Sequence, residues 1–423
     1  MAVPQIPPNT LVGRHAHRLV EEALADTPIV VIQGARQVGK STLATQVLAG
    51  RPSRLVTLDD PGIRAAAQAD PVTFVAQHLD GCLALDEIQR APSLILALKA
   101  AVDADRRPGR YLLTGSADLL RLPATQDSLA GRSESITLHG LSQGELAGAT
   151  EHFIDRLLAG DLMLDTPTGP DRADHMQRIC AGGYPEVLRR DPGRRRNAWF
   201  DNYVQRIVQR DAADISGLHR LADLPQLLRL LAARNAAELN RRSLANDTGI
   251  PERTLPPYLH LLETLHLVHY VPAWSNNLSK RVVERPKTMI CDTGLAARLI
   301  NVSAVALAAD LTPHRAGPLT ESFVISELRK QITWSDEQPS LYHYRDHDGA
   351  EIDIILETPD GRIAAIEVKA TATPTDGDFR WLRQLRDRLG PRFTAGITIH
   401  TGPHPLPWGD RLAALPLNAL WTA

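Results

Sequence analysis

The first third of the chain alternates between short apolar runs and segments in which apolar residues recur on one helical face. Apolar runs with the length of buried strands cover residues 29–32, 54–58, 81–87, 111–116 and 134–138. Helical periodicity covers residues 11–25, 41–47 and 64–78. Strands that alternate with helices in this way predict an α/β domain.

The middle of the chain has a different pattern. Helical periodicity runs from residue 146 to 164, and an amphipathic helix is expected at 221–233. A short turn with Gly249 then separates two more helical segments, and a strand-like run follows at 267–271. This order of elements predicts a winged helix-turn-helix.

The last quarter of the chain begins with residues 312–318, which we expect to form a linker. The pattern after it predicts, in order, a helix at 319–331, strands at 341–345, 351–356 and 363–369, a helix at 378–389 and a strand at 393–399. A hairpin turn is expected at 359–361, because Pro-Asp-Gly is a typical turn sequence. This pattern predicts a second α/β domain.

Composition narrows the class of protein. At 423 residues the chain is too long for a single ordinary core. A net charge of −2 argues against a uniformly basic nucleic-acid-binding surface, although a local basic patch stays open. Cys82, Cys180 and Cys291 have no C-x-x-C spacing, which argues against a cysteine-based zinc module and favours a reducing compartment. We find no leader segment and no apolar run of about 18 residues, so we expect a cytoplasmic protein without a membrane partner.

The segment between the first strand and its helix matches G-x-x-x-x-G-K-[ST], the phosphate-binding loop. Gly34 and Gly39 permit a tight turn whose N–H groups point inward, and the helix N-terminus behind the loop favours an anion. Lys40 is expected to reach the β- and γ-phosphates of ATP, and the Ser41 hydroxyl to bind Mg²⁺. The expected nucleotide-binding residues are Gly34, Ala35, Arg36, Gln37, Val38, Gly39, Lys40, Ser41 and Thr42.

Polar residues at the ends of later strands complete the predicted ATP site. Asp86 is expected to hold Mg²⁺ and Glu87 to polarise the attacking water, as in a Walker B motif. Ser116 ends the next strand and is our first candidate for a γ-phosphate sensor, with Thr114 second. Arg132 is either an arginine finger donated across a subunit interface or a solvated arginine at a surface turn.

Several motifs together resemble a family of prokaryotic AAA+-type ATPases in which a P-loop domain is fused to a C-terminal domain of unknown function. The shared motifs are GARQVGKST, LALDEIQ, LLTGSADLL, LAGRSESITLHGLSQGEL, GGYPEVL and DTGLAARL. The resemblance implies a helical lid after the P-loop domain, in which Tyr184 and Pro185 would pack against the nucleotide base. The alternative for these two residues is a turn that caps a helix.

Two features of the middle segment bear on DNA binding. A run of arginines could face phosphates, or it could form a solvated helix face paired with acids. The run comprises Arg189, Arg190, Arg194, Arg195, Arg196, Arg206 and Arg210. In the winged helix, Pro256 and Pro257 fall where a DNA-reading helix would carry basic residues, which favours a structural or protein-contact role.

The C-terminal segment resembles the PD-(D/E)xK nuclease fold. The resemblance rests on Glu321 in a helix, Asp353 in a strand, and Glu367 and Lys369 in the next strand. Carboxylates at Glu321, Asp353 and Glu367 would bind one or two Mg²⁺ ions, and Lys369 would lower the barrier to attack of water on a phosphodiester. The alternative is a retained fold that serves DNA docking or assembly without cleavage.

These expectations divide the chain into four domains and lead to two functional hypotheses. The domains are an AAA+-like P-loop ATPase at 1–145, a helical lid or connector at 146–215, a winged helix-turn-helix at 216–290 and a PD-(D/E)xK nuclease-like domain at 291–423. The leading hypothesis is a homo-oligomeric, ATP-driven, DNA-associated machine whose C-terminal domain binds or cuts DNA with Mg²⁺. The rival is an ATP-dependent oligomerising switch or scaffold whose C-terminal domain contacts proteins.

Overall fold

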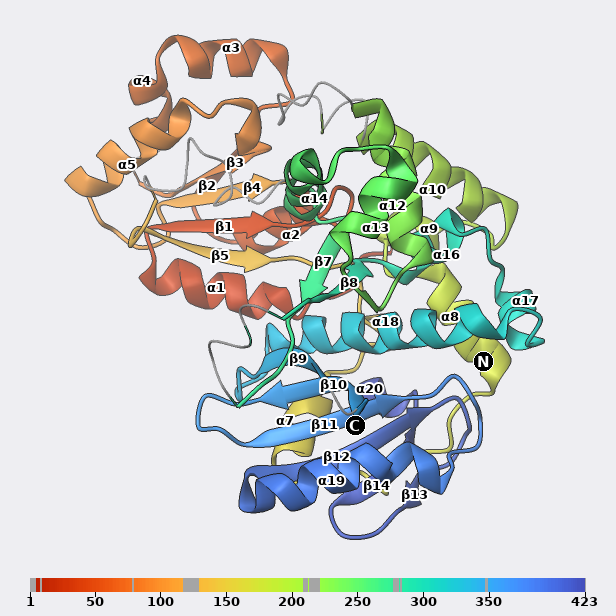
Figure 1. The fold of residues 1–423 in the computed structure, drawn as a ribbon. Helices are drawn as coiled ribbons and strands as arrows, with labels where there is room; N and C mark the ends of the chain where they lie inside the picture. Colours follow the sequence, from red (N-terminus) through yellow and green to blue (C-terminus); the bar gives the residue numbers. More distant parts are fainter. Residues whose placement is uncertain are drawn as a thin grey trace. The chain divides into compact units, whose positions relative to one another are not determined.

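The chain forms two compact units. The computed structural model describes residues 5–7, 10–77, 80–116, 129–207, 212, 221–276, 281, 284–346 and 349–422 (Figure 1). The smaller unit comprises Val12–Leu141 and Thr264–His266, and the larger one Met1–Leu11, Ser142–Glu263 and Leu267–Ala423. No helix in the described ranges combines the length and the apolar character needed to cross a membrane.

The smaller unit is built on a five-stranded parallel sheet in the order β2-β3-β4-β1-β5. Its strands are β1 (Ile29–Gln33), β2 (Ser53–Thr57), β3 (Cys82–Asp86), β4 (Tyr111–Gly115) and β5 (Ser133–Thr137). β1 and β4 are buried throughout, as expected for central strands of a sheet covered on both faces. The predicted α/β class of this region is therefore confirmed.

Helices cover both faces of this sheet. They are α1 (Ala16–Asp26), α2 (Lys40–Leu48), α3 (Pro61–Ala69), α4 (Pro71–Val75) and α5 (Leu94–Ala104). Figure 1 shows α1 on one side of the sheet and α4 and α5 on the other. The single helix predicted at 64–78 is wrong, because Asp70 ends α3 and its side chain accepts a hydrogen bond from the N–H of Thr73 to cap α4.

The larger unit begins with short helices. They are α6 (Gln143–Ala147), α7 (Phe153–Leu158), α8 (Arg172–Ala181), α9 (Pro185–Leu188) and α10 (Arg194–Arg206). The continuous helix predicted at 146–164 is wrong. Gly148, with φ of +69°, ends α6 in the left-handed conformation that terminates many helices.

The next segment has the element order expected of a winged helix-turn-helix. Its elements are α12 (Leu224–Ala233), β6 (Ala237–Glu238), α13 (Arg241–Thr248), α14 (Leu255–Thr264), β7 (Val268–Val271) and β8 (Lys287–Ile290). The three strands form a small antiparallel sheet in the order β6-β8-β7. Gly249 caps α13 with φ of +69°, and two short helices follow the sheet, α16 (Thr293–Leu299) and α17 (Ala304–Ala308).

The C-terminal part is a six-stranded mixed sheet in the order β13-β14-β12-β11-β10-β9. Its elements are α18 (Pro313–Ile332), β9 (Ser340–Arg345), β10 (Glu351–Glu357), β11 (Ile363–Val368), α19 (Arg380–Leu389), β12 (Phe393–His400), β13 (Leu406–Pro407), β14 (Leu412–Pro416) and α20 (Ala419–Thr422). β9, β10 and β11 are antiparallel, whereas β11, β12 and β14 run parallel. The predicted strands are present, and the identity of this sheet with a nuclease fold stays a prediction.

The linker predicted at 312–318 is wrong, because these residues form the start of α18. Pro313 occupies the first turn of the helix, where a backbone N–H has no partner to lose. Pro318 lies within the helix, and the neighbouring Ala316 and Leu319 are buried. Burial of this apolar face compensates for the hydrogen bond that Pro318 removes.

Candidate active site

The phosphate loop joins β1 to α2 in a conformation that only glycine fits at two positions. Gly34 has φ of +149°, and a Cβ atom there would lie 2.2 Å from the carbonyl oxygen of Leu138. Gly39 has φ of +102°, a region that other residues rarely adopt. The two glycines that define the motif are therefore both required by the backbone.

Lys40 is folded into the loop that precedes it. Its side chain is buried, and its ammonium donates hydrogen bonds to the carbonyl oxygens of Gly34 at 3.0 Å and Ala35 at 2.9 Å. These carbonyls hold the positive charge inside the ring of backbone N–H groups that the motif is expected to present to phosphates. Contact of Lys40 with the β- and γ-phosphates of ATP stays a prediction.

A hydroxyl and a carboxylate meet at the carboxyl edge of the sheet. Ser41 Oγ donates a hydrogen bond to Asp86 Oδ1 at 2.7 Å, and Thr114 Oγ1 donates to the same oxygen. Hydroxyl and carboxylate oxygens are the ligands that Mg²⁺ accepts in ATPases. Ser41 and Asp86 therefore fit the predicted metal, and Thr114 orients Asp86.

Glu87 is connected to Ser116 through a residue that our sequence analysis did not single out. Gln89 Nε2 donates hydrogen bonds to Glu87 Oε2 and, at 3.0 Å, to Ser116 Oγ. Glu87 adopts a left-handed backbone conformation with φ of 60°, and its N–H donates to Thr114 Oγ1 at 3.2 Å. Such a conformation in a non-glycine residue is uncommon and concentrates at functional sites.

Arg14 is a second residue that sequence reasoning missed. Its guanidinium donates hydrogen bonds to the carbonyl oxygen of Val38 in the phosphate loop at 2.8 Å and to that of His139 at 2.7 Å. Arg14 thereby ties the loop to the segment that follows β5. No motif marks an arginine before the first helix, so the sequence carried no signal for this contact.

Arg132 lies at the opposite edge of the sheet from the phosphate loop. It immediately precedes β5, whose first residue Ser133 pairs with Ile29 at the start of β1. Its guanidinium forms a two-pronged ion pair with Asp103, at 2.6 Å and 3.0 Å, which lowers the pKa of that carboxyl. A role at the nucleotide of a neighbouring subunit stays a prediction, and it would require this pair to open.

Tyr184 and Pro185 form a turn between two helices. The Tyr184 ring is buried against Trp199 and Tyr203, and its hydroxyl lies 2.9 Å from that of Tyr203. Pro185 starts α9, and Gly182 ends α8 with φ of +68°. This is the geometry of the helix-capping alternative, and a contact of Tyr184 with a nucleotide base stays a prediction.

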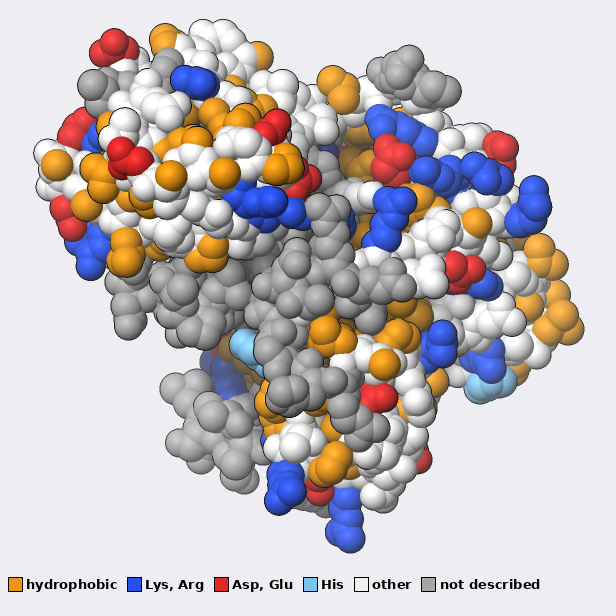
Figure 2. Space-filling view, turned by 90° about the horizontal axis from the view of Figure 1, so that it is seen from above, with side chains coloured by type: hydrophobic (Ala, Val, Ile, Leu, Met, Phe, Trp, Pro, Cys, Tyr) orange, Lys and Arg blue, Asp and Glu red, His pale blue; other side chains and the backbone are white. Residues whose placement is uncertain are grey.

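Several of the predicted arginines are occupied by neighbouring groups. Arg189 and Arg190 form ion pairs with Glu186, at 3.0 Å and 3.1 Å. Arg196 is buried and donates to the carbonyl oxygen of Arg190, while Arg210 lies outside the described residues. On the face drawn in Figure 2, basic side chains lie among acidic and apolar ones. The contacts of Arg189 and Arg190 match the alternative of pairing with acids, and a phosphate-facing role for the rest of the run stays a prediction.

The C-terminal residues that the nuclease resemblance selected do come together. Asp353 Oδ2 accepts a hydrogen bond from the N–H of Val368 at 2.9 Å, and Lys369 Nζ lies 2.7 Å from Glu367 Oε1. Burial, and then the neighbouring Asp353, raise the pKa of Glu321 well above its ordinary value. The same two causes raise the pKa of Glu367 to about 8.

A lysine from outside the predicted nuclease-like domain lies among these carboxylates. Lys287 Nζ, on β8, lies 2.8 Å from Glu321 Oε1, 3.3 Å from Asp353 Oδ1 and 3.3 Å from Glu351 Oε1. Burial alone would lower the pKa of Lys287, but the carboxylates around it raise the pKa overall. Within the described ranges, no three His, Cys, Asp or Glu side chains are grouped so that they could hold a metal ion. In this arrangement the set does not fit the Mg²⁺ that the resemblance implied.

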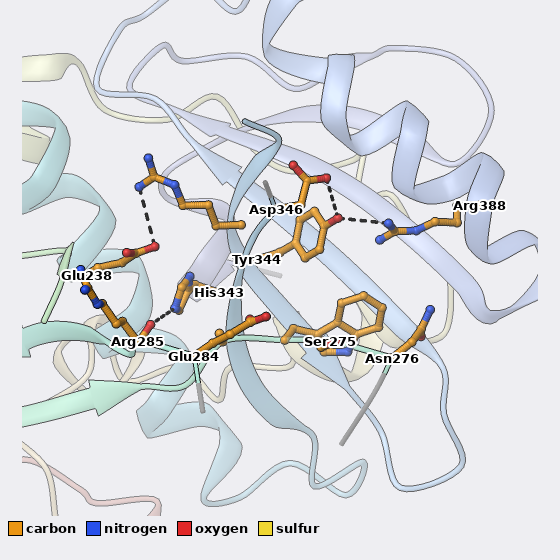
Figure 3. A pocket seen from close by; sticks show the side chains of 12 residues that line it. Glu238, Ser275, Asn276, Glu284, Arg285, His343, Tyr344, Asp346 and Arg388 are labelled. Carbon is orange, nitrogen blue, oxygen red and sulfur yellow. Dashed lines mark hydrogen bonds and ion pairs between the residues drawn. The ribbon is translucent and has the colours of Figure 1, made fainter. Parts of the chain in front are cut away.

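A pocket of about 430 Å³ is lined in part by Glu284 and Arg285, which precede Lys287 in the sequence (Figure 3). Arg388 donates a hydrogen bond to the hydroxyl of Tyr344 at 3.0 Å, and that hydroxyl donates to Asp346 at 3.0 Å. His343 Nε2 lies 3.1 Å from the carbonyl oxygen of Arg285. Burial is the main reason why the pKa of His343 falls to about 4, so the ring is neutral at pH 7.

Comparison with known families divides the chain into three parts. Residues 26–147 match the AAA domain family, residues 172–306 match a domain of unknown function (DUF8612), and residues 316–420 match another (DUF4143). Residues 26–147 are thus similar to an AAA domain, which agrees with the α/β class seen in the structure and supports ATP binding by the phosphate loop. The other two matches carry no description of function.

Similar proteins cover nearly the whole chain. The uncharacterized proteins Rv2008c of Mycobacterium tuberculosis and Mb2031c of Mycobacterium bovis are each 28% identical over 410 residues, which is 97% of this chain and 84% of theirs. Among solved structures, the Walker-type ATPase PABY2304 of Pyrococcus abyssi is 16% identical, with a TM-score of 0.41 over 70% of this chain and 98% of its own. AMPPCP-bound DnaA of Aquifex aeolicus is 15% identical, with a TM-score of 0.29 over 60% and 90%.

Proposed function

We propose that this chain is a Mg²⁺-dependent ATPase. The observation that carries the proposal is the contact of Ser41 with Asp86 beside a phosphate loop that already contains the ammonium of Lys40. A hydroxyl from the helix and a carboxylate from β3 meet at the edge of a parallel sheet where ligands of such sheets bind. The AAA-domain match at residues 26–147 supports the same activity.

The roles of the residues follow from their positions. Lys40 and the loop N–H groups would bind the β- and γ-phosphates, and Ser41 and Asp86 would hold Mg²⁺, which neutralises charge on the phosphates. Glu87 would orient and polarise the attacking water. Gln89 would position Glu87. Its hydrogen bond to Ser116 would couple Glu87 to the γ-phosphate sensor at the end of β4.

Steady-state ATP hydrolysis tests this proposal. We expect Mg²⁺-dependent release of phosphate by the full chain and a loss of about 100-fold or more in kcat when Lys40→Ala removes the phosphate-binding charge. Lys99→Ala is the matched control, because Lys99 belongs to the same unit but lies in α5, outside the phosphate loop. A Lys40→Ala variant that hydrolyses ATP at the wild-type rate would refute the assignment.

We propose that the ATPase works as a nucleotide-dependent oligomerising switch, with the DNA-associated machine as the second candidate. In α14, the helix that would read DNA, the exposed residues include Pro256, Pro257 and His260, which offer no charge complementary to phosphates. Exposed Arg194 and Arg195 at the start of α10 favour the second candidate. The arrangement of Lys287 among the carboxylates gives metal-dependent cleavage no support.

Two measurements separate these candidates. A switch should change its mass in solution between the ATP-bound and ADP-bound forms, and its hydrolysis rate should not respond to duplex or single-stranded DNA. A DNA-associated machine should be stimulated by DNA and should lose DNA affinity steeply as salt rises. Strong stimulation by DNA, abolished by Arg194→Ala with Arg195→Ala, would overturn the switch.

A further inference from the structure

The carboxylates of Glu321, Glu351, Asp353 and Glu367, here called the carboxylate cluster, surround a cation that belongs to the chain itself. We infer that Lys287 is the resident cation of this cluster and occupies the position that a divalent metal ion would need. The ion pairs of Lys287 with Glu321, Glu351 and Asp353, here called the ionic lock, then stand in place of a metal-dependent nuclease centre. This inference does not depend on the ATPase proposal.

Two hydrogen bonds, to Glu321 and Asp353, and one further ion pair, with Glu351, surround the ammonium. An ammonium has three N–H donors, and Lys287 meets carboxylate oxygens of Glu321, Glu351 and Asp353 at 2.8 to 3.3 Å. The Lys287 side chain is only 3% exposed, so water does not compete for these contacts. Three carboxylates from two different elements, α18 and β10, converge on one nitrogen.

A metal ion and this ammonium would need the same oxygens. Mg²⁺ binds carboxylate oxygens at about 2.1 Å, and it would have to take Glu321 Oε1 and Asp353 Oδ1 from Lys287. Two cations within about 4 Å in a buried site repel each other strongly. Binding of the metal therefore requires Lys287 to leave.

The remaining predicted ligands are also engaged by groups of the protein. The second oxygen of Asp353 accepts the N–H of Val368 at 2.9 Å. Glu367 is paired with Lys369 at 2.7 Å, and Asp378 lies 3.8 Å from the same ammonium. Each member of the set selected by the nuclease resemblance thus has a partner within the chain.

The lock joins two parts of the larger unit that are distant in sequence. Lys287 belongs to β8 of the small antiparallel sheet, whereas Asp353 belongs to β10 of the six-stranded sheet. The same junction contains a bridge between Ala273 and His343 and a hydrogen bond of 2.6 Å from the N–H of Trp274 to the carbonyl oxygen of His343. Lys287 therefore contributes both charge neutralisation and attachment of the small sheet.

Manganese binding by the nucleotide-free full chain tests the inference, with Mn²⁺ followed by electron paramagnetic resonance and calorimetry. We expect no wild-type Mn²⁺ site that depends on Asp353. Lys287→Met should create one Mn²⁺ site per chain, because it frees the carboxylates and keeps the volume of the side chain. Adding Asp353→Asn to that variant should abolish the new site.

Lys330→Met is the matched control. Lys330 is also buried, and it forms an ion pair with Glu327, which is not a member of the carboxylate cluster, so its replacement should leave the cluster unchanged and create no Mn²⁺ site there. Circular dichroism establishes that each variant is folded before its titration. A folded Lys287→Met chain without new Mn²⁺ binding would overturn the inference.

The wild-type titration decides the question even where Lys287→Met does not fold. A wild-type chain that binds Mn²⁺ at a site lost in Asp353→Asn would show that the cluster accepts a metal with Lys287 present, and the inference would fail. Repeating the titration with Asp86→Ala removes the carboxylate that we propose for Mg²⁺ in the ATP site, so any Mn²⁺ bound there is kept out of the result. Failure of the ATPase proposal would leave these titrations unchanged, so the two outcomes are distinguishable.

Discussion

The backbone N–H of Gly183 donates a hydrogen bond of 2.7 Å to Asp292 Oδ2, across 109 residues of sequence. The other carboxylate oxygen of Asp292 accepts from the N–H of Leu295 and caps α16. One buried carboxylate therefore joins two sequence motifs, GGYPEVL and DTGLAARL. The Asp292 side chain is buried, and this burial raises the pKa of its carboxyl.

This junction makes Gly182→Ala a sensitive test of packing. Gly182 has φ of +68°, and a Cβ atom there would lie 2.3 Å from Asp292 Oδ1. We expect Gly182→Ala to lower the free energy of unfolding by about 2–4 kcal/mol, from backbone strain and from displacement of the cap. Urea denaturation followed by circular dichroism measures the change.

Gly193→Ala controls for the backbone strain alone. Gly193 has a similar φ of +80°, but a Cβ atom there would meet nothing within 4 Å. Its substitution should cost about 1–3 kcal/mol from backbone strain and less than that of Gly182. Equal losses in the two variants would show that the contact with Asp292 contributes nothing beyond the conformation of the backbone.

Gln89→Ala tests the link between Glu87 and Ser116. Without the amide, Glu87 should sample more orientations, and we expect kcat for ATP hydrolysis to fall about 10- to 100-fold. The affinity for ATP should stay within about twofold, because the hydrogen bonds of Gln89 among the described residues go to Glu87 and Ser116, which lie outside the phosphate loop. Single-turnover hydrolysis and nucleotide titration measure the two quantities.

The control for this prediction is Gln68→Ala, an exposed glutamine of α3 in the same unit. Its hydrolysis rate should match that of the wild type. If Gln89→Ala weakened ATP binding and left the rate of the bound complex intact, Gln89 would be supporting the loop and our assignment of it as a positioning residue would be wrong.

Arg14→Ala tests the support of the phosphate loop. Loss of the hydrogen bonds to Val38 and His139 leaves the loop more mobile before ATP binds, so ordering it on binding costs more. We expect the Kd for ATP to rise about tenfold, with a smaller effect on kcat. Arg18→Ala, which removes an exposed pair with Glu22 in α1, should leave Kd unchanged. An unchanged Kd in Arg14→Ala would contradict the prediction.

Sequence reasoning succeeded where the chemistry is local. The residues of the phosphate loop are adjacent in the sequence, and the backbone requires its two glycines, so the motif alone predicted this turn between β1 and α2. Breaks at Asp70 and Gly148 were missed, because helical periodicity continues through both positions. The signals were present, since Asp before Pro favours a helix start and glycine a helix end.

The rest of the candidate sites depends on contacts that no local pattern encodes. Lys287 lies 34 residues from Glu321 and 66 from Asp353, on a different sheet from that of Asp353. Arg14 reaches His139 across 125 residues. A motif can select carboxylates that suit a metal, but the cation that occupies them is fixed by how β8 packs against α18 and β10. That packing is tertiary and was not legible in the sequence.

The acid sensitivity of folding can be tested at His175. Its side chain is buried, and neither ring nitrogen meets a hydrogen-bond partner in the described part of the chain. Burial and then the charge of Arg178 lower the pKa of His175 from 6.5 to about 4, and His400 lowers it slightly further. Asp174 and Asp171 raise the pKa by smaller amounts. The folded chain therefore keeps this ring neutral at a pH where the unfolded chain protonates it.

The sign of the effect follows from proton binding. Below pH 6.5 the unfolded state binds a proton at His175 that the folded state does not bind until about pH 4. The contribution of His175 to the free energy of unfolding is therefore constant above pH 6.5 and falls as the pH drops through this window, by up to about 1.4 kcal/mol per pH unit. His175→Phe removes the titrating group and its unsatisfied nitrogens, while the ring can still contact Trp421. We expect a shallower loss of stability between pH 6.5 and 4 and no loss at pH 7, measured by urea denaturation across the range.

His152→Gln, at an exposed position, should retain the wild-type slope. A His175→Phe variant with that same slope would show that His175 titrates alike in both states.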